Sequence, residues 1–154
     1  MDSFGYKLLL LLHILSVIVA FAPAFVWPVA SVKLKKEGKP VGPTIGDLAA
    51  GNTAKIHGPA LVLVGLFGFG LIGMSDEAWK FSQGWVSGAM TVWLIMLGLV
   101  FGMMLPAEKK AAAGDEGADK IVSAVGGVLH LLLVIMLFLM IWKLGSSLRK
   151  SDNR

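Results

Sequence analysis

The chain alternates four long apolar runs with polar segments. The runs cover residues 6–30, 57–75, 81–105 and 121–143. A bilayer core of roughly 30 Å needs about 20 helical residues to cross it, and lipid offers the backbone no hydrogen bonds. Each run is apolar on every side, whereas the strands of a transmembrane barrel alternate apolar and polar residues. The pattern therefore predicts an all-α, multi-pass membrane protein, a four-transmembrane-helix bundle that forms a single membrane domain over residues 1–154.

The polar segments add local predictions. A Thr-x-x-Asp sequence that begins at Thr44 resembles a capping box and predicts a short interfacial helix over 44–57, lying on the membrane surface. Residues 106–120 are rich in Lys, Ala, Gly and Glu, which predicts an exposed, flexible loop. Pro23 and Pro28 each remove a helix hydrogen bond, so we expect the last turns of the first run to be kinked or loosened.

Composition supports lipid as the solvent of this fold. Hydrophobic residues make up 56% of the chain and charged residues only 16%, whereas a water-soluble domain carries about 25% charged residues. The chain has no cysteine, which excludes disulfides, zinc-thiolate sites, iron–sulfur clusters and covalent c-type haem. The net charge is +4, and the lysines lie beside apolar runs, where anionic lipid headgroups are a nearer partner than nucleic acid.

Basic residues predict the orientation in the cell (inner) membrane. The side that bears the two longer loops has eight: Lys33, Lys35, Lys36, Lys39, Lys55, Lys109, Lys110 and Lys120. The side that bears both termini has six: Lys7, Lys80, Lys143, Arg149, Lys150 and Arg154. Because basic loops favour the cytoplasmic side, we expect the loops inside and both termini on the outside.

Glycines are frequent within the runs, and the chain has 19 in all. The third run contains two small-xxx-small pairs, Gly84 with Gly88 and Gly98 with Gly102. In lipid, such residues let helix backbones approach closely. We expect them to pack a compact bundle, and the alternative is that they leave room for a flat cofactor.

Three histidines are the candidate ligands, because no carboxylate or lysine lies deep within the runs. At 1.5 Å of rise per residue, His13 lies about 9 Å, His130 about 19 Å and His57 about 28 Å from the terminal side. These unequal depths disfavour a haem held by two histidines. Each histidine is either a ligand or a neutral core residue hydrogen-bonded to a hydroxyl or a helix carbonyl.

Two methionines fit mixed ligation at these depths. Met136 lies about 10 Å deep, level with His13, and Met96 lies within a turn of the His130 level. A histidine and a methionine form an accepted axial pair for haem, and they also suit copper(I). His13, His130, Met136 and Met96 are therefore the candidate cofactor-binding residues for haem b, and His13 and His130 are the candidate metal ligands. Methionine also fills gaps in apolar cores, which is the alternative role.

The first run also carries a resemblance. Its two short motifs are Leu11-Leu12-His13-Ile14-Leu15-Ser16 and Phe21-Ala22-Pro23-Ala24-Phe25-Val26-Trp27-Pro28. They resemble the first span of an uncharacterised bacterial family of predicted four-helix integral membrane proteins, a domain of unknown function. More distantly, a histidine early in the first of four spans is similar to the haem-associated protoporphyrinogen oxidase family and to the copper-resistance membrane domain. That similarity implies that His13 is a haem or metal ligand.

Two functions follow as predictions. The sequence shows no Ser/His/Asp set, no HExxH motif and no phosphate-binding glycine loop, so no catalytic residue is predicted. We expect a non-catalytic subunit or accessory protein of a larger membrane assembly, with other membrane subunits as partners. The alternative is a b-type haem or copper protein in electron transfer or porphyrin chemistry, with His13, His130 or both as ligands.

Overall fold

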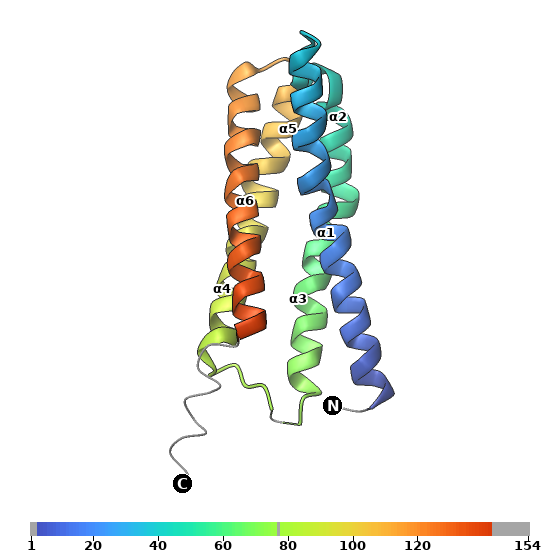
Figure 1. Ribbon diagram of the computed structural model, residues 1–154, viewed down its shortest axis with the longest axis vertical. Coiled ribbons are helices and arrows are strands. Elements are labelled where there is room, and N and C mark those ends of the chain that lie inside the picture. Colours follow the sequence, from blue (N-terminus) through green and yellow to red (C-terminus); the bar gives the residue numbers. More distant parts are fainter. Residues whose placement is uncertain (1–2, 77, 143–154) are drawn as a thin grey trace.

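A computed structural model describes residues 3–76 and 78–142 of the chain. The described residues form four helical rods that lie side by side, each antiparallel to the next along the chain (Figure 1). The rods are α1 (Phe4–Lys36), then α2 (Val41–Asn52), η1 (Thr53–His57) and α3 (Gly58–Gly73), then α4 (Gly84–Leu99), η2 (Val100–Met104) and α5 (Leu105–Ala112), and finally α6 (Glu116–Trp142). Here η denotes a π-helix. By length and composition, all four rods can cross a membrane, so the predicted all-α, four-helix architecture is confirmed at that level.

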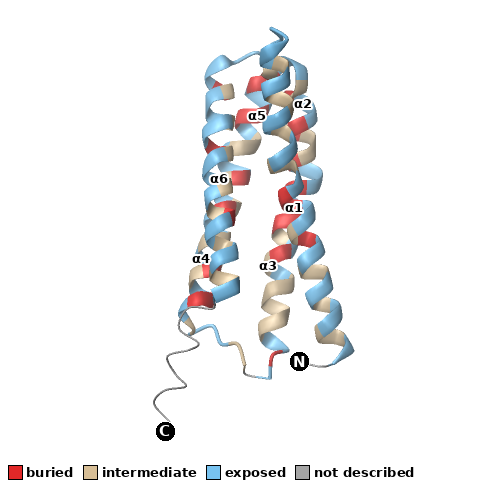
Figure 2. Ribbon diagram, in the orientation of Figure 1, coloured by how far each residue is buried: buried red, intermediate tan, exposed pale blue. Residues whose placement is uncertain are grey.

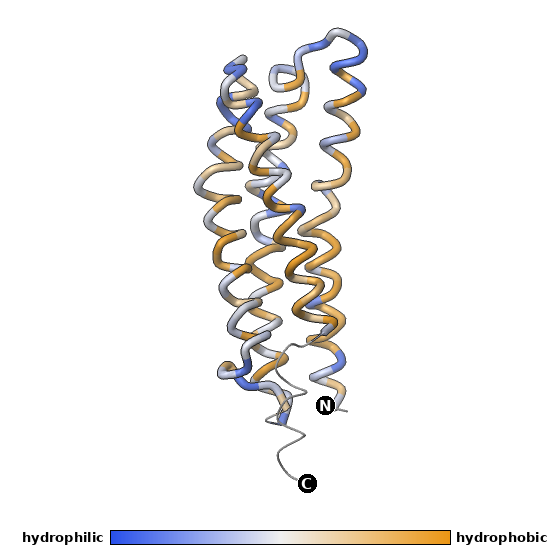
Figure 3. The backbone as a smooth tube through the Cα atoms, turned by 60° about the vertical axis from the view of Figure 1, so that its left-hand side comes forward, coloured by the Kyte–Doolittle hydropathy of each residue, from blue (hydrophilic) through white to orange (hydrophobic). Residues whose placement is uncertain are grey.

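The rods bury a narrow core and expose large apolar side chains. The core cluster consists of Ala20, Phe21, Ala60, Leu61, Val64, Met96, Val100, Val125, Leu129 and Leu133. Large apolar residues such as Ile18 and Leu131 are 58% and 60% exposed. Exposed residues occur along most of α1 and α6 (Figure 2). The most strongly polar stretches gather near the two ends of the bundle (Figure 3). A helix that is apolar on all sides and yet exposed needs an apolar solvent, which is compatible with a multi-pass membrane protein.

The predicted interfacial helix is helical but does not lie across the bundle. α2 continues through η1 into α3 as one rod (Figure 1). Its glycines pack against α5: a Cβ atom on Gly42 would meet the carbonyl carbon of Ala111 at 2.8 Å, and one on Gly46 would meet Ala112 Cα at 2.8 Å. Small residues of α2 contact a neighbouring helix closely and hold α2 along the bundle axis. The position of this segment relative to the membrane surface stays a prediction.

The predicted loop over 106–120 is also mostly helical. α5 extends to Ala112 and α6 begins at Glu116. The chain turns between them at Gly114, whose φ of +95° favours glycine. The Asp115 carboxylate then accepts the backbone N–H groups of Gly117 and Ala118 at 2.8 and 3.1 Å, which caps the start of α6. The prediction of a flexible loop was therefore wrong, because α5 is a helix whose residues Ala107 and Ala111 pack inward.

α1 passes both internal prolines without ending. Pro23 and Pro28 lie inside a helix that continues to Lys36, so the predicted loosening of its last turns did not break the helix. The start of α1 and the end of α6 lie at the same end of the bundle, called here the terminal end (Figure 1). The opposite end, where Lys33, Lys35 and Lys36 close α1, is called the basic end.

The membrane side of each end stays a prediction. Four of the counted basic residues, Lys143, Arg149, Lys150 and Arg154, lie outside the described residues.

Candidate functional site

A cavity of about 550 Å³ lies in the terminal half of the bundle, between the α1–α3 pair and the α4–α6 pair. This volume falls within the range of about 300–1,000 Å³ that is usual for small-molecule sites. All four rods contribute to its lining, which is overwhelmingly apolar. The side chains that bring chemistry to it are Tyr6, His13, Trp79, Trp85, Met90, Trp93, Met96, Met136 and Met140.

Trp93 of α4 connects the two helix pairs and forms one wall of this cavity. Its Nε1–H donates a hydrogen bond to the Leu61 carbonyl of α3 at 2.8 Å. Its ring packs edge-to-face on Phe69, with centroids 5.6 Å apart. Gly65 makes this approach possible, because a Cβ atom there would overlap the indole ring. Gly65 therefore allows close packing between α3 and α4.

His13 of α1 points at α3 and lines the cavity. Its Nδ1 lies 2.9 Å from the Val64 carbonyl oxygen. A carbonyl can only accept, so Nδ1 carries the hydrogen, and in the neutral ring Nε2 is left with a free lone pair. A Cβ atom on Gly68 would lie 3.5 Å from His13 Cε1, an ordinary van der Waals contact, so the ring lies directly beside this glycine. Such fixing of one ring nitrogen is how proteins orient histidine ligands.

The structure brings three of the four candidate ligands to one cavity. Met136 of α6 and Met96 of α4 line the same space as His13. Met90 and Met140 also line it and were not predicted, since sequence depth alone does not show which helix face points inward. Thioether sulfur is a soft ligand for haem iron or copper(I), and it also packs well against apolar ligands.

His130 lies elsewhere in the bundle. Its Nδ1 is 2.7 Å from the Gly126 carbonyl of its own preceding turn, and its ring meets Phe25 edge-to-face at 5.5 Å. Phe25 is twelve residues along α1 from His13, roughly 18 Å of helix rise. His13 and His130 therefore do not share a site, which agrees with the depths that disfavour ligation by two histidines. A ligand role for His130 alone stays a prediction.

His57 is buried in η1 and does not line the cavity. Across residues 3–76 and 78–142, no group of three His, Cys, Asp or Glu side chains could hold a metal ion.

Trp85 lines the cavity and also has a buried, unpaired donor. The residue is 7% exposed, and its Nε1 is buried without a hydrogen-bond partner in the described structure. Trp79 packs edge-to-face on it at 5.3 Å. An unsatisfied buried donor costs about 1–3 kcal/mol, and because Nε1 is buried it does not face the cavity. The sequence did not indicate this burial, because a tryptophan near a span end also suits an interfacial anchor.

A second polar site lies where η1 meets the α5 rod. Glu108 of α5 is 2% exposed and hydrogen-bonded to Thr53. Sequence reasoning missed it because residues 106–120 were predicted to form an exposed loop.

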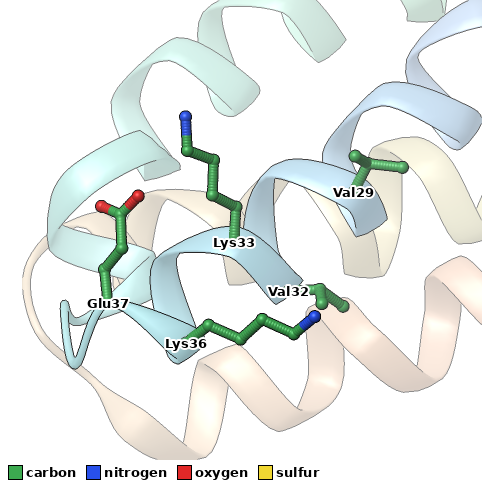
Figure 4. Close-up of a pocket in the computed structure, with 5 residues that line it drawn as sticks. All are labelled: Val29, Val32, Lys33, Lys36 and Glu37. Carbon is green, nitrogen blue, oxygen red and sulfur yellow. The ribbon is translucent and has the colours of Figure 1, made fainter.

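A shallow hollow of about 430 Å³ also lies on α1 near the basic end (Figure 4). Its lining residues are Val29, Val32, Lys33, Lys36 and Glu37. Lys33 and Lys36 extend in different directions and do not converge on one point (Figure 4). Exposed lysines beside valines suit general contact with lipid headgroups better than a specific ligand.

Comparison with known proteins found no matching family model, no matching curated protein and no matching solved structure. The resemblances drawn from the first run therefore stay predictions. The geometry of the cavity is what bears on function.

Proposed function

We propose that this chain is an integral membrane protein that binds a flat, largely apolar cofactor in the cavity between the α1–α3 and α4–α6 pairs. Haem b is the candidate cofactor. The observation that supports this most is the placement of His13 on a cavity of about 550 Å³, with Nδ1 held by the Val64 carbonyl. A fixed tautomer that leaves Nε2 available beside an apolar cavity is the arrangement that a metal-centred cofactor needs.

The lining residues fit such a group. His13 Nε2 would hold the haem iron, and Met136 of α6, or alternatively Met96 of α4, would supply a thioether ligand. Gly68 lies beside the imidazole, where a side chain larger than a methyl group would crowd the ring. Bound haem would supply one-electron chemistry, and a methionine ligand would raise its reduction potential.

The test is a visible absorption spectrum of the detergent-purified protein, oxidised and reduced, before and after addition of haem. We expect a Soret band that His13→Ala abolishes and Met136→Leu shifts in the reduced form. His130→Ala is the matched control and should keep the wild-type spectrum, since its ring lies outside the cavity. A spectrum without a Soret band after haem addition, or an unchanged one in His13→Ala, would contradict the proposal. Metal analysis of the same samples tests the copper alternative.

The accessory-subunit function predicted from the sequence needs a surface for a partner. Exposed apolar residues such as Leu11 and Leu131 can contact either lipid or a partner protein. They therefore do not favour the accessory-subunit function over cofactor binding. It is tested by extracting an affinity-tagged chain from its own membrane in mild detergent. A membrane protein recovered in fixed stoichiometry would support it, and an isolated chain would not.

A further inference from the structure

The contact between the two middle rods contains a buried carboxyl group. Glu108 of α5 is 2% exposed, and Thr53, which is 1% exposed and begins η1, hydrogen-bonds to its side chain. The second carboxyl oxygen, Oε2, is buried without a partner among the described residues. Asn52, the neighbour of Thr53, likewise buries its Nδ2 without a partner. Two polar groups on adjoining elements are thus incompletely satisfied.

An ionised carboxylate at this position would lack the compensation that burial requires. Burying a charge is strongly unfavourable unless a cation or several donors stabilise it. Glu108 has one such donor, Thr53, and no described lysine or arginine forms an ion pair with it. A neutral carboxylic acid avoids most of this cost.

The surrounding charged groups do not change that balance. Six charged residues on α5 and on the neighbouring elements α2, η1 and α6 are exposed to solvent: Lys109, Lys110, Asp47, Lys55, Glu116 and Lys120. Asp119 of α6 accepts the Gly42 backbone N–H at 3.3 Å. His57, one turn after Thr53 on η1, is the remaining titratable group buried nearby.

We propose that Glu108 is a proton-binding site, with Oε2 carrying one exchangeable proton at neutral pH. Protonation forms the Oε2–H bond with a proton taken from hydronium, and it leaves a neutral carboxyl group hydrogen-bonded to Thr53. The site belongs to the basic end of the bundle, away from the cavity, and it does not depend on the proposed cofactor. π-Helices recur at functional sites, and Thr53 lies in one while Glu108 closely follows the other.

The test is infrared spectroscopy of the purified chain in phosphatidylcholine vesicles, where the C=O stretch of a protonated carboxyl group is separate from the carboxylate bands. At neutral pH we expect this protonated band in the wild type and its loss in Glu108→Gln. Glu116→Gln, which changes an exposed glutamate at the start of α6, is the matched control and should keep the band. Thr53→Val should keep the band and shift its frequency, because a hydrogen bond to the carboxyl group is removed.

A second measurement does not depend on whether a variant folds. Wild-type protein is labelled with ¹³C at its glutamate carboxyl groups, and the C=O band of the protonated carboxyl group must then move to lower frequency. A wild-type spectrum without the band at neutral pH overturns the proposal. A band that appears only after sodium is replaced by a large organic cation also overturns it, because a metal ion would then occupy the site.

Discussion

Gly65→Ala tests how closely α3 and α4 approach beside the cavity. A Cβ atom at Gly65 would lie 2.7 Å from Trp93 Cη2 and closer still to Cζ2 and Cε2. The indole has little freedom to retreat, because Nε1 is hydrogen-bonded to Leu61 and the ring packs on Phe69. The substitution must therefore separate the two helices or expel the ring.

The expected cost follows from these contacts. Overpacking a well-packed core costs about 1–3 kcal/mol. Expelling the ring also loses the Trp93–Leu61 hydrogen bond, worth about 0.5–1.5 kcal/mol. Alanine offsets part of this by roughly 1 kcal/mol through its better helix propensity. We expect the free energy of unfolding to fall by about 1–3 kcal/mol.

The assay is reversible unfolding in mixed micelles, followed by far-ultraviolet circular dichroism. Gly98→Ala is the matched control, since nothing lies within 4 Å of its Cβ position, and it should be neutral or slightly stabilising. Trp93→Phe shortens the ring, so combining it with Gly65→Ala should recover part of the loss in a double-mutant cycle. A Gly65→Ala protein as stable as the wild type, with no coupling to Trp93, would refute the reasoning.

The remaining predictions concern packing and the cavity. Gly68→Leu places a branched side chain beside the His13 ring, so haem titration should show lost binding with helix content retained; retained binding would place the cofactor elsewhere. Gly46→Ala directs a Cβ atom at the Ala112 backbone, so the free energy of unfolding should fall by at least as much as for Gly65→Ala. Met96 is 1% exposed, so Met96→Ala should lower the free energy of unfolding by about 2–5 kcal/mol, and a loss below about 1 kcal/mol would argue against tight packing there.

The helical architecture was predictable because lipid leaves a spanning chain few choices. Four apolar runs correspond to four rods, and regular helix rise alone puts His13 and Met136 at similar depths. Both residues line one cavity. Depth is a one-dimensional quantity that a sequence encodes directly, so this part of the candidate site could be anticipated.

Contacts between helices were not predictable from the sequence. Val64 is 51 residues from His13, and nothing in either segment indicates that its carbonyl holds the imidazole. In the sequence, Gly46 looks like a residue that interrupts a helix. In the structure, it is the point where the backbone of Ala112 packs closely against α2. Glu108 reads as a loop charge because Lys109 and Lys110 follow it, and its burial appears only when α2 covers that face of α5. These features depend on which helix lies opposite, which hydropathy does not specify.

The two π-helices have a consequence for changes in chain length. Each uses i→i+5 hydrogen bonds, as in the bond from the Gly58 N–H to the Thr53 carbonyl, so each holds one residue more than an α-helical turn. Deleting the exposed Ala54 would let η1 close as an ordinary α-helix, with the outward faces of α2 and α3 kept in place. These two turns are therefore the places where each middle rod can lose one residue and continue as a straight α-helix.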